Sequence, residues 1–180
     1  DSPPEKDVQW SNQGVNASYK FLQKIYNLNN IIINRSDKKG IKNNEYEVKF
    51  NNYISKITKL IENFNLNVVV ANIYSIYNLF SIATNEEVSN ACLRKYFSNF
   101  LKILIPFTPH LAYECLEKIG EKDFDTWPKI ESGLVSNDKI KIAIQINGKT
   151  SDVIEIKKDI GEKEATAKSK MSEKVNNKLK

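Results

Sequence analysis

The segment that most constrains the fold is residues 67–84, NVVVANIYSIYNLFSIAT, which contains no charged side chain. Its length and its lack of strict alternation between apolar and polar residues favour a helix over a strand. A helix that is apolar around most of its circumference needs other elements packed on several sides. We therefore predict that 67–84 forms the middle helix of a bundle.

Four other segments show the apolar spacing of amphipathic helices and supply the packing partners. They are residues 11–34, 45–63, 86–105 and 109–119. Ser11 and Thr108 are expected to cap two of these helices with their hydroxyl oxygens, and Gly120 is expected to end the last one.

Two polar stretches are assigned to the surface. The run RSDKKGIKNN at 35–44 is charged and contains Gly40, so we interpret it as an exposed connection. In 86–105, Arg94, Ser98 and Lys102 recur every fourth residue, which places them together on one helix face. We expect that face to point outward.

The pattern changes after Trp127-Pro128. In residues 139–146, KIKIAIQI, apolar side chains occupy every second position, which predicts a strand with one buried face. Asn147-Gly148 follows directly and is the strongest two-residue hairpin signal, because a type I′ turn needs positive φ at both central residues. A second strand over 149–157 and a weak helix over 162–179 complete this part.

These patterns predict a mainly α fold in two domains. An antiparallel helical bundle is expected over residues 1–130, and a small α+β unit with a β-hairpin over residues 131–180.

Cysteine usage and hydropathy narrow the class of protein. Cys92 and Cys115 are far apart and without a CxxC pattern, so we predict two buried thiols in a reducing compartment and neither a disulfide nor a metal site. From the sequence we expect no apolar run long enough to cross a bilayer, and the first residues do not resemble a secretory leader. We therefore expect a cytoplasmic protein without a membrane partner.

Two motifs could indicate catalysis or nucleotide binding. Gly148-Lys149-Thr150 matches the end of a phosphate-binding loop, but that loop needs glycine where Ala143 stands and a helix where a strand follows. His110 is the only histidine and has no Ser, Asp or Glu at a spacing that makes a partner, so we interpret it as packed or capping. No catalytic or cofactor-binding residue is predicted.

The remaining candidate is a basic outer surface of the bundle. Lys and Arg number 27 against 22 acidic residues, a net charge of +5 that suits a polyanionic partner. The candidate phosphate-contacting residues are Lys20, Lys24, Arg94, Lys95 and Lys102, with Lys149 in the hairpin as a weaker addition. The rival interpretation is a non-catalytic protein-interaction bundle whose basic face is only solvated.

Several segments together resemble bacterial leucyl-tRNA synthetases. DSPPEKDVQWS at 1–11 is similar to the stretch that leads into their anticodon-binding bundle, and IPFTPHLAYECLEKIG at 105–120 is similar to their Pro-His helix. Trp127-Pro128 and IQINGKTSDVIEI at 144–156, with its Gln-x-Asn-Gly-Lys, follow in the family's order and spacing.

This resemblance implies a C-terminal fragment of a leucine-tRNA ligase, which begins without Met and lacks the family's closing strand beyond Lys180. It implies tRNA(Leu) as the partner, a monomer, and a chain that holds no cofactor itself. ATP and Mg²⁺ would be bound by upstream domains of the parent enzyme. Leucylation and editing would occur there, while this part positions the tRNA by its shape more than by its anticodon.

Overall fold

The structure is a computed structural model that describes residues 6, 7, 10–131, 133, 139–146, 149–157 and 161–170. The chain divides into two compact units, Asp1–Leu134 and Val135–Lys180. The first unit is helical, and the second contains the strands.

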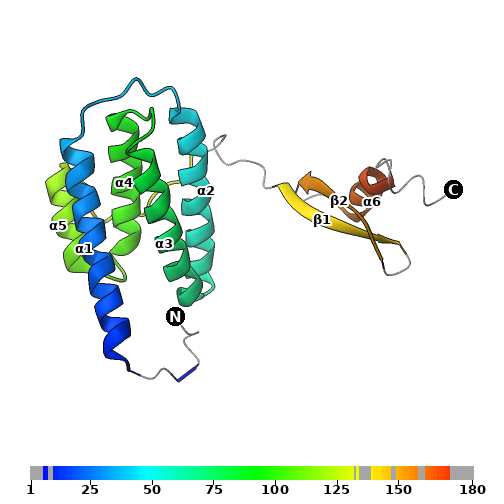
Figure 1. Cartoon of the computed structure of the whole chain (residues 1–180), viewed down its shortest axis with the longest axis horizontal. Coiled ribbons are helices and arrows are strands. Elements are labelled where there is room, and N and C mark those ends of the chain that lie inside the picture. Colours follow the sequence, from blue (N-terminus) through cyan, green and yellow to red (C-terminus); the bar gives the residue numbers. More distant parts are fainter. Residues whose placement is uncertain are drawn as a thin grey trace. The chain divides into compact units, whose positions relative to one another are not determined.

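The first unit is the predicted helical bundle (Figure 1). Its helices are α1 Asn12–Asn34, α2 Asn43–Glu62, α3 Leu66–Ala83, α4 Asn90–Leu104 and α5 Pro109–Ile119. Short connections between successive helices reverse the chain each time, so neighbours run antiparallel. The N-terminal part of α1, residues 12–20, is exposed throughout.

The central helix of the bundle is α4, which packs against α1, α2, α3 and α5. Nine of its 15 residues are buried. The prediction that 67–84 is the middle helix was therefore wrong. The exposed side of α3 carries Ala71, Ser75 and Asn78, small or neutral side chains that a count of charges does not distinguish from core residues.

By length and composition alone, α3 is apolar enough to cross a membrane, contrary to the expectation from the sequence. In the bundle, its buried side chains contribute to a common core with the other helices. Helices that line a protein core pass the same test of length and composition.

An aromatic cluster centred on Phe80 of α3 forms the middle of the core. The Phe80 ring stacks on Phe50 of α2, with centroids 4.2 Å apart and an interplanar angle of 15°. Phe97 of α4 meets it edge-on at 5.1 Å, and Phe100 lies at 5.7 Å. All four side chains are fully buried, so the cluster joins three helices through ring contacts.

Of the three helix ends predicted from capping residues, two have the expected structure. Ser11 accepts a hydrogen bond from the Gly14 N–H at 3.0 Å and caps α1, as predicted. Gly120 ends α5 in the left-handed conformation at φ 85°, also as predicted. Thr108 occupies the capping position of α5, but its side chain makes no capping bond, so that prediction was wrong. α4 begins at residue 90 because Ser89 caps it by accepting from the Cys92 N–H.

The second unit contains the predicted antiparallel strands, β1 Lys139–Ile146 and β2 Lys149–Lys157, followed by α6 Glu162–Lys170. Ile142 pairs with Ile154, and the register shifts after Ile144. Asn147-Gly148 and the rest of the predicted last helix lie outside the described residues.

The apolar face of this hairpin is less buried than its alternation predicts. Ile142 is 37% exposed, and Ile144 and Ile154 are half-buried. A two-stranded sheet buries a face only where another element covers it, so the prediction of one buried face was wrong at Ile142 and only partly met at Ile144 and Ile154.

Candidate nucleic-acid interface

The outer face of α1 is basic and free of carboxylates. The helix contains no Asp or Glu along its 23 residues. Lys20 and Lys24 are exposed, and neither forms an ion pair within the described part of the chain. The exposed amide side chains of the same helix are Asn12, Gln13, Asn16, Gln23, Asn27 and Asn34. Ammonium and amide groups of this kind donate to phosphate oxygens and ribose hydroxyls.

Arg94 and Lys95 are both engaged with the bundle itself. An Arg94 Nη donates to the Ile33 carbonyl at 2.8 Å, so this guanidinium closes the C-terminal turn of α1 while staying exposed. The Lys95 ammonium lies 2.6 Å from a Glu131 carboxylate oxygen. Of the two, Arg94 adds positive charge at the end of the α1 face, whereas Lys95 is neutralised by its partner.

Lys102 does not lie on an open surface. Its side chain is 10% exposed, and its ammonium lies 3.8 Å from the carboxylates of both Glu121 and Asp123. Ser98, one turn earlier, is buried. The prediction of an outer face was right for Arg94, which is exposed, and wrong for Ser98 and Lys102. At Lys102 the reason is that the chain after α5 brings Glu121 and Asp123 to this side of α4.

Lys149 is the first residue of β2, opposite Ile146. Its side chain lies outside the described residues. The predicted candidates therefore fall into four groups. Lys20 and Lys24 lie on α1, and Arg94 of α4 contacts the C-terminal end of α1. Lys95 and Lys102 are held by carboxylates, and Lys149 lies in the other unit.

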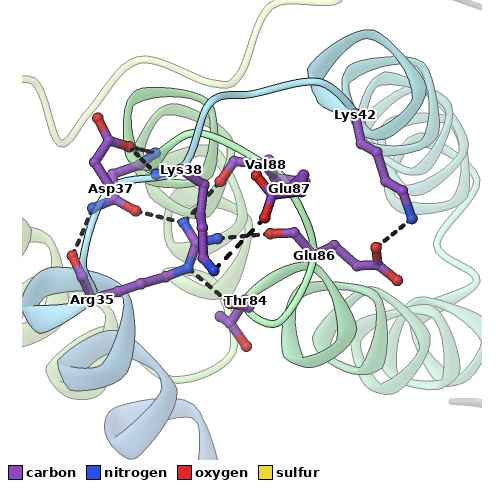
Figure 2. Close-up of polar contacts among 9 residues, drawn as sticks. Arg35, Asp37, Lys38, Lys42, Thr84, Glu86, Glu87 and Val88 are labelled. Carbon is purple, nitrogen blue, oxygen red and sulfur yellow. Dashed lines mark hydrogen bonds and ion pairs between the residues drawn. The ribbon is translucent and has the colours of Figure 1, made fainter.

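The connection at 35–42 is fastened to the turn between α3 and α4, which the sequence did not indicate (Figure 2). The Arg35 guanidinium donates to the carbonyls of Thr84, Glu86 and Val88, each at 2.8 Å, and to the Asn90 side chain at 2.6 Å. These backbone acceptors lie about 50 residues away in the chain, so no local pattern identifies them.

We call the contact of the connection at 35–42 with the turn between α3 and α4 the joint between the two connections. Three carboxylates support it (Figure 2). Lys42 pairs with Glu86, and Lys38 lies 3.8 Å from Glu87. Asp37 accepts from the backbone N–H of Asn90 at 2.7 Å, a bond that lowers the pKa of its carboxyl group. The positive charges of this end are thus largely matched by acids, unlike those of α1.

A polar network fixes the last segment of the bundle unit. Asn51 donates to the Tyr96 hydroxyl at 2.9 Å, and that hydroxyl donates to Glu131 at 3.2 Å. The Glu131 backbone N–H donates to the Asn51 side-chain oxygen at 3.1 Å. Earlier in the same segment, the Trp127 indole donates to Thr58 at 2.9 Å.

Glu131 should make bundle stability depend on pH. Its bond with Lys95 lowers its pKa below the ordinary 4.5, so its contribution is complete above pH 4.5 and disappears as pH falls further. We expect Glu131→Gln to lose less than about 1 kcal/mol at pH 7, because the pair is partly exposed. Urea unfolding between pH 7 and pH 3 should show the gap from wild type closing. Glu117→Gln, at an exposed position, is the control, and a gap independent of pH would contradict the assignment.

The remaining candidates for chemistry are the two cysteines and the histidine. Cys92 and Cys115 are free and buried, as predicted, and burial raises the pKa of Cys92 to about 12 and that of Cys115 to about 11. His110 is exposed at the second position of α5, so of the two interpretations, packed or capping, the packed one was wrong. Within the described ranges, no group of three His, Cys, Asp or Glu side chains could hold a metal ion.

Comparison with known proteins gives a family match and a set of relatives. Residues 43–167 match the model of the anticodon-binding domain of tRNA ligase. The leucine–tRNA ligase of Rickettsia bellii is 32% identical over 168 residues, and that of Caulobacter vibrioides is 34% identical over 178 residues. These alignments cover 91% and 92% of this chain but 20% of each relative, so the chain spans about a fifth of their length.

The fold also has a counterpart among solved structures. A ternary complex of an Agrobacterium radiobacter K84 LeuRS with tRNA and LeuAMS superposes with a TM-score of 0.68 at 22% identity, over 96% of this chain and 23% of that one. The resemblance to leucyl-tRNA synthetases inferred from the sequence motifs is confirmed by these relatives. The chain belongs to the family of anticodon-binding domains of tRNA ligases.

Proposed function

We propose that this chain is the tRNA-binding C-terminal part of a leucine-tRNA ligase and positions tRNA(Leu) for leucylation by domains outside it. The observation that carries the proposal is the carboxylate-free face of α1, with Lys20 and Lys24 exposed and unpaired among the described residues. The leucine–tRNA ligases to which the chain is similar supply the parent reaction and the amino acid.

The chemistry of this face suits the RNA backbone. Lysine ammonium groups neutralise phosphates, and the neighbouring amides can donate to phosphate and 2′-hydroxyl oxygens without reading bases. Arg94 extends the face at the C-terminal end of α1, and Lys149 of the second unit is a further candidate. Lys95 and Lys102 rank below these, because contact with phosphate would compete with their carboxylate partners.

The rest of the reaction belongs to other domains in this proposal. ATP and Mg²⁺ would act in the catalytic domain of a monomeric, cytoplasmic parent enzyme. The chain alone should then show no leucine-dependent exchange of pyrophosphate into ATP. Measurable exchange by the purified chain would contradict this division of labour.

A protein-interaction module is the alternative, and the surface of α3 favours it. Val68 and Ile82 are 39% and 56% exposed, and Tyr74 is 40% exposed. Exposed apolar residues that form a contiguous patch mark contact with another protein surface, whereas single ones are common on any surface. Such a module would bind tRNA weakly or with no steep dependence on salt, whereas binding through phosphates requires that dependence.

Charge reversal on α1 tests the proposal directly. We expect Lys20→Glu combined with Lys24→Glu to lower affinity for tRNA(Leu) at least about 10-fold at low salt and to reduce the slope of log affinity against log salt by about 2. Filter binding over a range of KCl concentrations would measure both. The control is Lys56→Glu with Lys59→Glu on the exposed side of α2. Equal losses in both double variants would indicate a general charge effect and contradict a specific α1 face.

A further inference from the structure

A groove separates α1 from the N-terminal turn of α5. Its volume is about 720 Å³. Tyr19, Gln23 and Asn27 line it from α1, and Thr108 and His110 line it from the other side. It thus opens beside the carboxylate-free face of α1, and no Asp or Glu is among its lining residues.

Its lining combines a stacking surface with hydrogen-bonding groups. Tyr19 is 60% exposed, and its ring stacks on no other aromatic side chain in the described residues. Gln23 and Asn27 offer both donors and acceptors at spacings of four and eight residues from Tyr19, so all three lie on one helix face. Aromatic rings that stack on a base, beside amides that bond its edge, are how proteins bind unpaired nucleotides.

Two features of the far wall support a ligand that accepts hydrogen bonds. The Thr108 hydroxyl oxygen is buried and has no hydrogen-bond partner in the described residues. A buried hydroxyl without a partner is costly, and turning toward a ligand in the groove would satisfy it. The N-terminus of α5 also faces the groove through Pro109 and His110, and the positive end of a helix dipole favours a phosphate nearby.

We propose that this groove binds an unpaired nucleotide of the RNA, with its base stacked on Tyr19 and its base edge bonded by Gln23 and Asn27. The proposal rests on the proposed tRNA-binding function and adds a site that reads a base beside a surface that contacts phosphates. The charge of the surroundings favours RNA over a protein segment: Lys20 lies next to Tyr19, and α1 offers no carboxylate to a basic peptide.

His110 provides a probe within the groove, because it is the only histidine of the chain. Its imidazole C–H signal in a ¹H–¹³C NMR spectrum needs no further assignment. We expect a tRNA(Leu) transcript to shift or broaden this signal, and a hexamer of uridylate at millimolar concentration to shift it in the same direction. A signal that moves with neither RNA would overturn the proposal.

Substitutions at Tyr19 separate this site from the phosphate-contacting face. Tyr19→Ala should weaken tRNA(Leu) binding about 5- to 50-fold without changing the salt slope, since a stacked base contributes affinity but no counterion release. Tyr19→Phe should retain binding, and Ile31→Ala, at an exposed position of α1 outside the groove, is the control. Wild-type binding with steep salt dependence but no effect of Tyr19→Ala would overturn the nucleotide site and leave the proposed function intact. No salt-dependent binding of tRNA by the wild type would overturn both.

Discussion

Replacing Phe80 by alanine should lower the free energy of unfolding by about 3–5 kcal/mol, the largest single-residue loss that we expect in this chain. Phe80 is fully buried and contacts the rings of Phe50, Phe97 and Phe100. Alanine would remove the ring on which three helices meet, and a cavity between rigid aromatic side chains collapses poorly. The loss therefore combines the transfer energy of the ring with the energy of the cavity.

Urea denaturation followed by the helical circular dichroism signal would measure this loss. Ile82→Ala on the same helix is the matched control, because Ile82 is 56% exposed and should change stability by no more than about 0.5 kcal/mol. Phe80→Leu fills part of the cavity and should lie between the two. If Phe80→Ala and Ile82→Ala cost the same, the aromatic cluster would not be the centre of the core.

The contrast between buried Phe80 and exposed Ile82 on one helix also marks the limit of what the sequence could predict. Apolar periodicity identified every helix of the bundle, because a helix that buries one face repeats apolar residues every three or four positions. It could not rank the helices by burial: α3 has no charged residue yet exposes Ile82, whereas α4 carries Arg94, Lys95 and Lys102 and is central. A central helix can keep lysines where another segment brings carboxylates to them.

In the candidate site, too, features set by a single helix could be predicted, and features set by contacts between distant segments could not. Lys20 and Lys24 could be placed correctly on an exposed face because α1 alone determines it. The environment of Lys102 depends on Glu121 and Asp123, which reach it only after the chain turns at Gly120. No sequence pattern indicates the groove either, since it forms between α1 and α5. Contacts between distant segments decide which cations stay free for a ligand.

The hydrogen bonds from Arg35 to the turn between α3 and α4, which form the joint between the two connections, are the strongest case of such a contact. Removing them should cause the second largest loss in the free energy of unfolding. Arg35→Met would leave the carbonyls of Thr84, Glu86 and Val88 without their donor. Because the site is partly buried and water can replace some of these bonds, we expect a loss of about 2–3 kcal/mol. Arg35→Lys should recover less than half of it, since an ammonium lacks the planar fork that reaches several carbonyls at once.

Hydrogen exchange would show where this loss occurs. Amide protection should fall in the turn between α3 and α4 and in the first turn of α4, where the Ser89 and Asn90 N–H groups are bonded to Asn43 and Asp37. Arg94→Met is the control: among the described residues Arg94 makes one hydrogen bond, to Ile33, and it is exposed. Its loss should therefore stay below about 1 kcal/mol. Equal effects at Arg35 and Arg94 would contradict a joint centred on Arg35.

The same variant separates stability from RNA binding. Acids match most of the positive charge around Arg35, whereas α1 has none to match Lys20 and Lys24. Under conditions where Arg35→Met remains folded, its affinity for tRNA(Leu) should therefore stay within about 3-fold of wild type, because no counterion-releasing contact is lost. A steep fall in affinity without unfolding would instead place the RNA at the joint between the two connections and count against the α1 face.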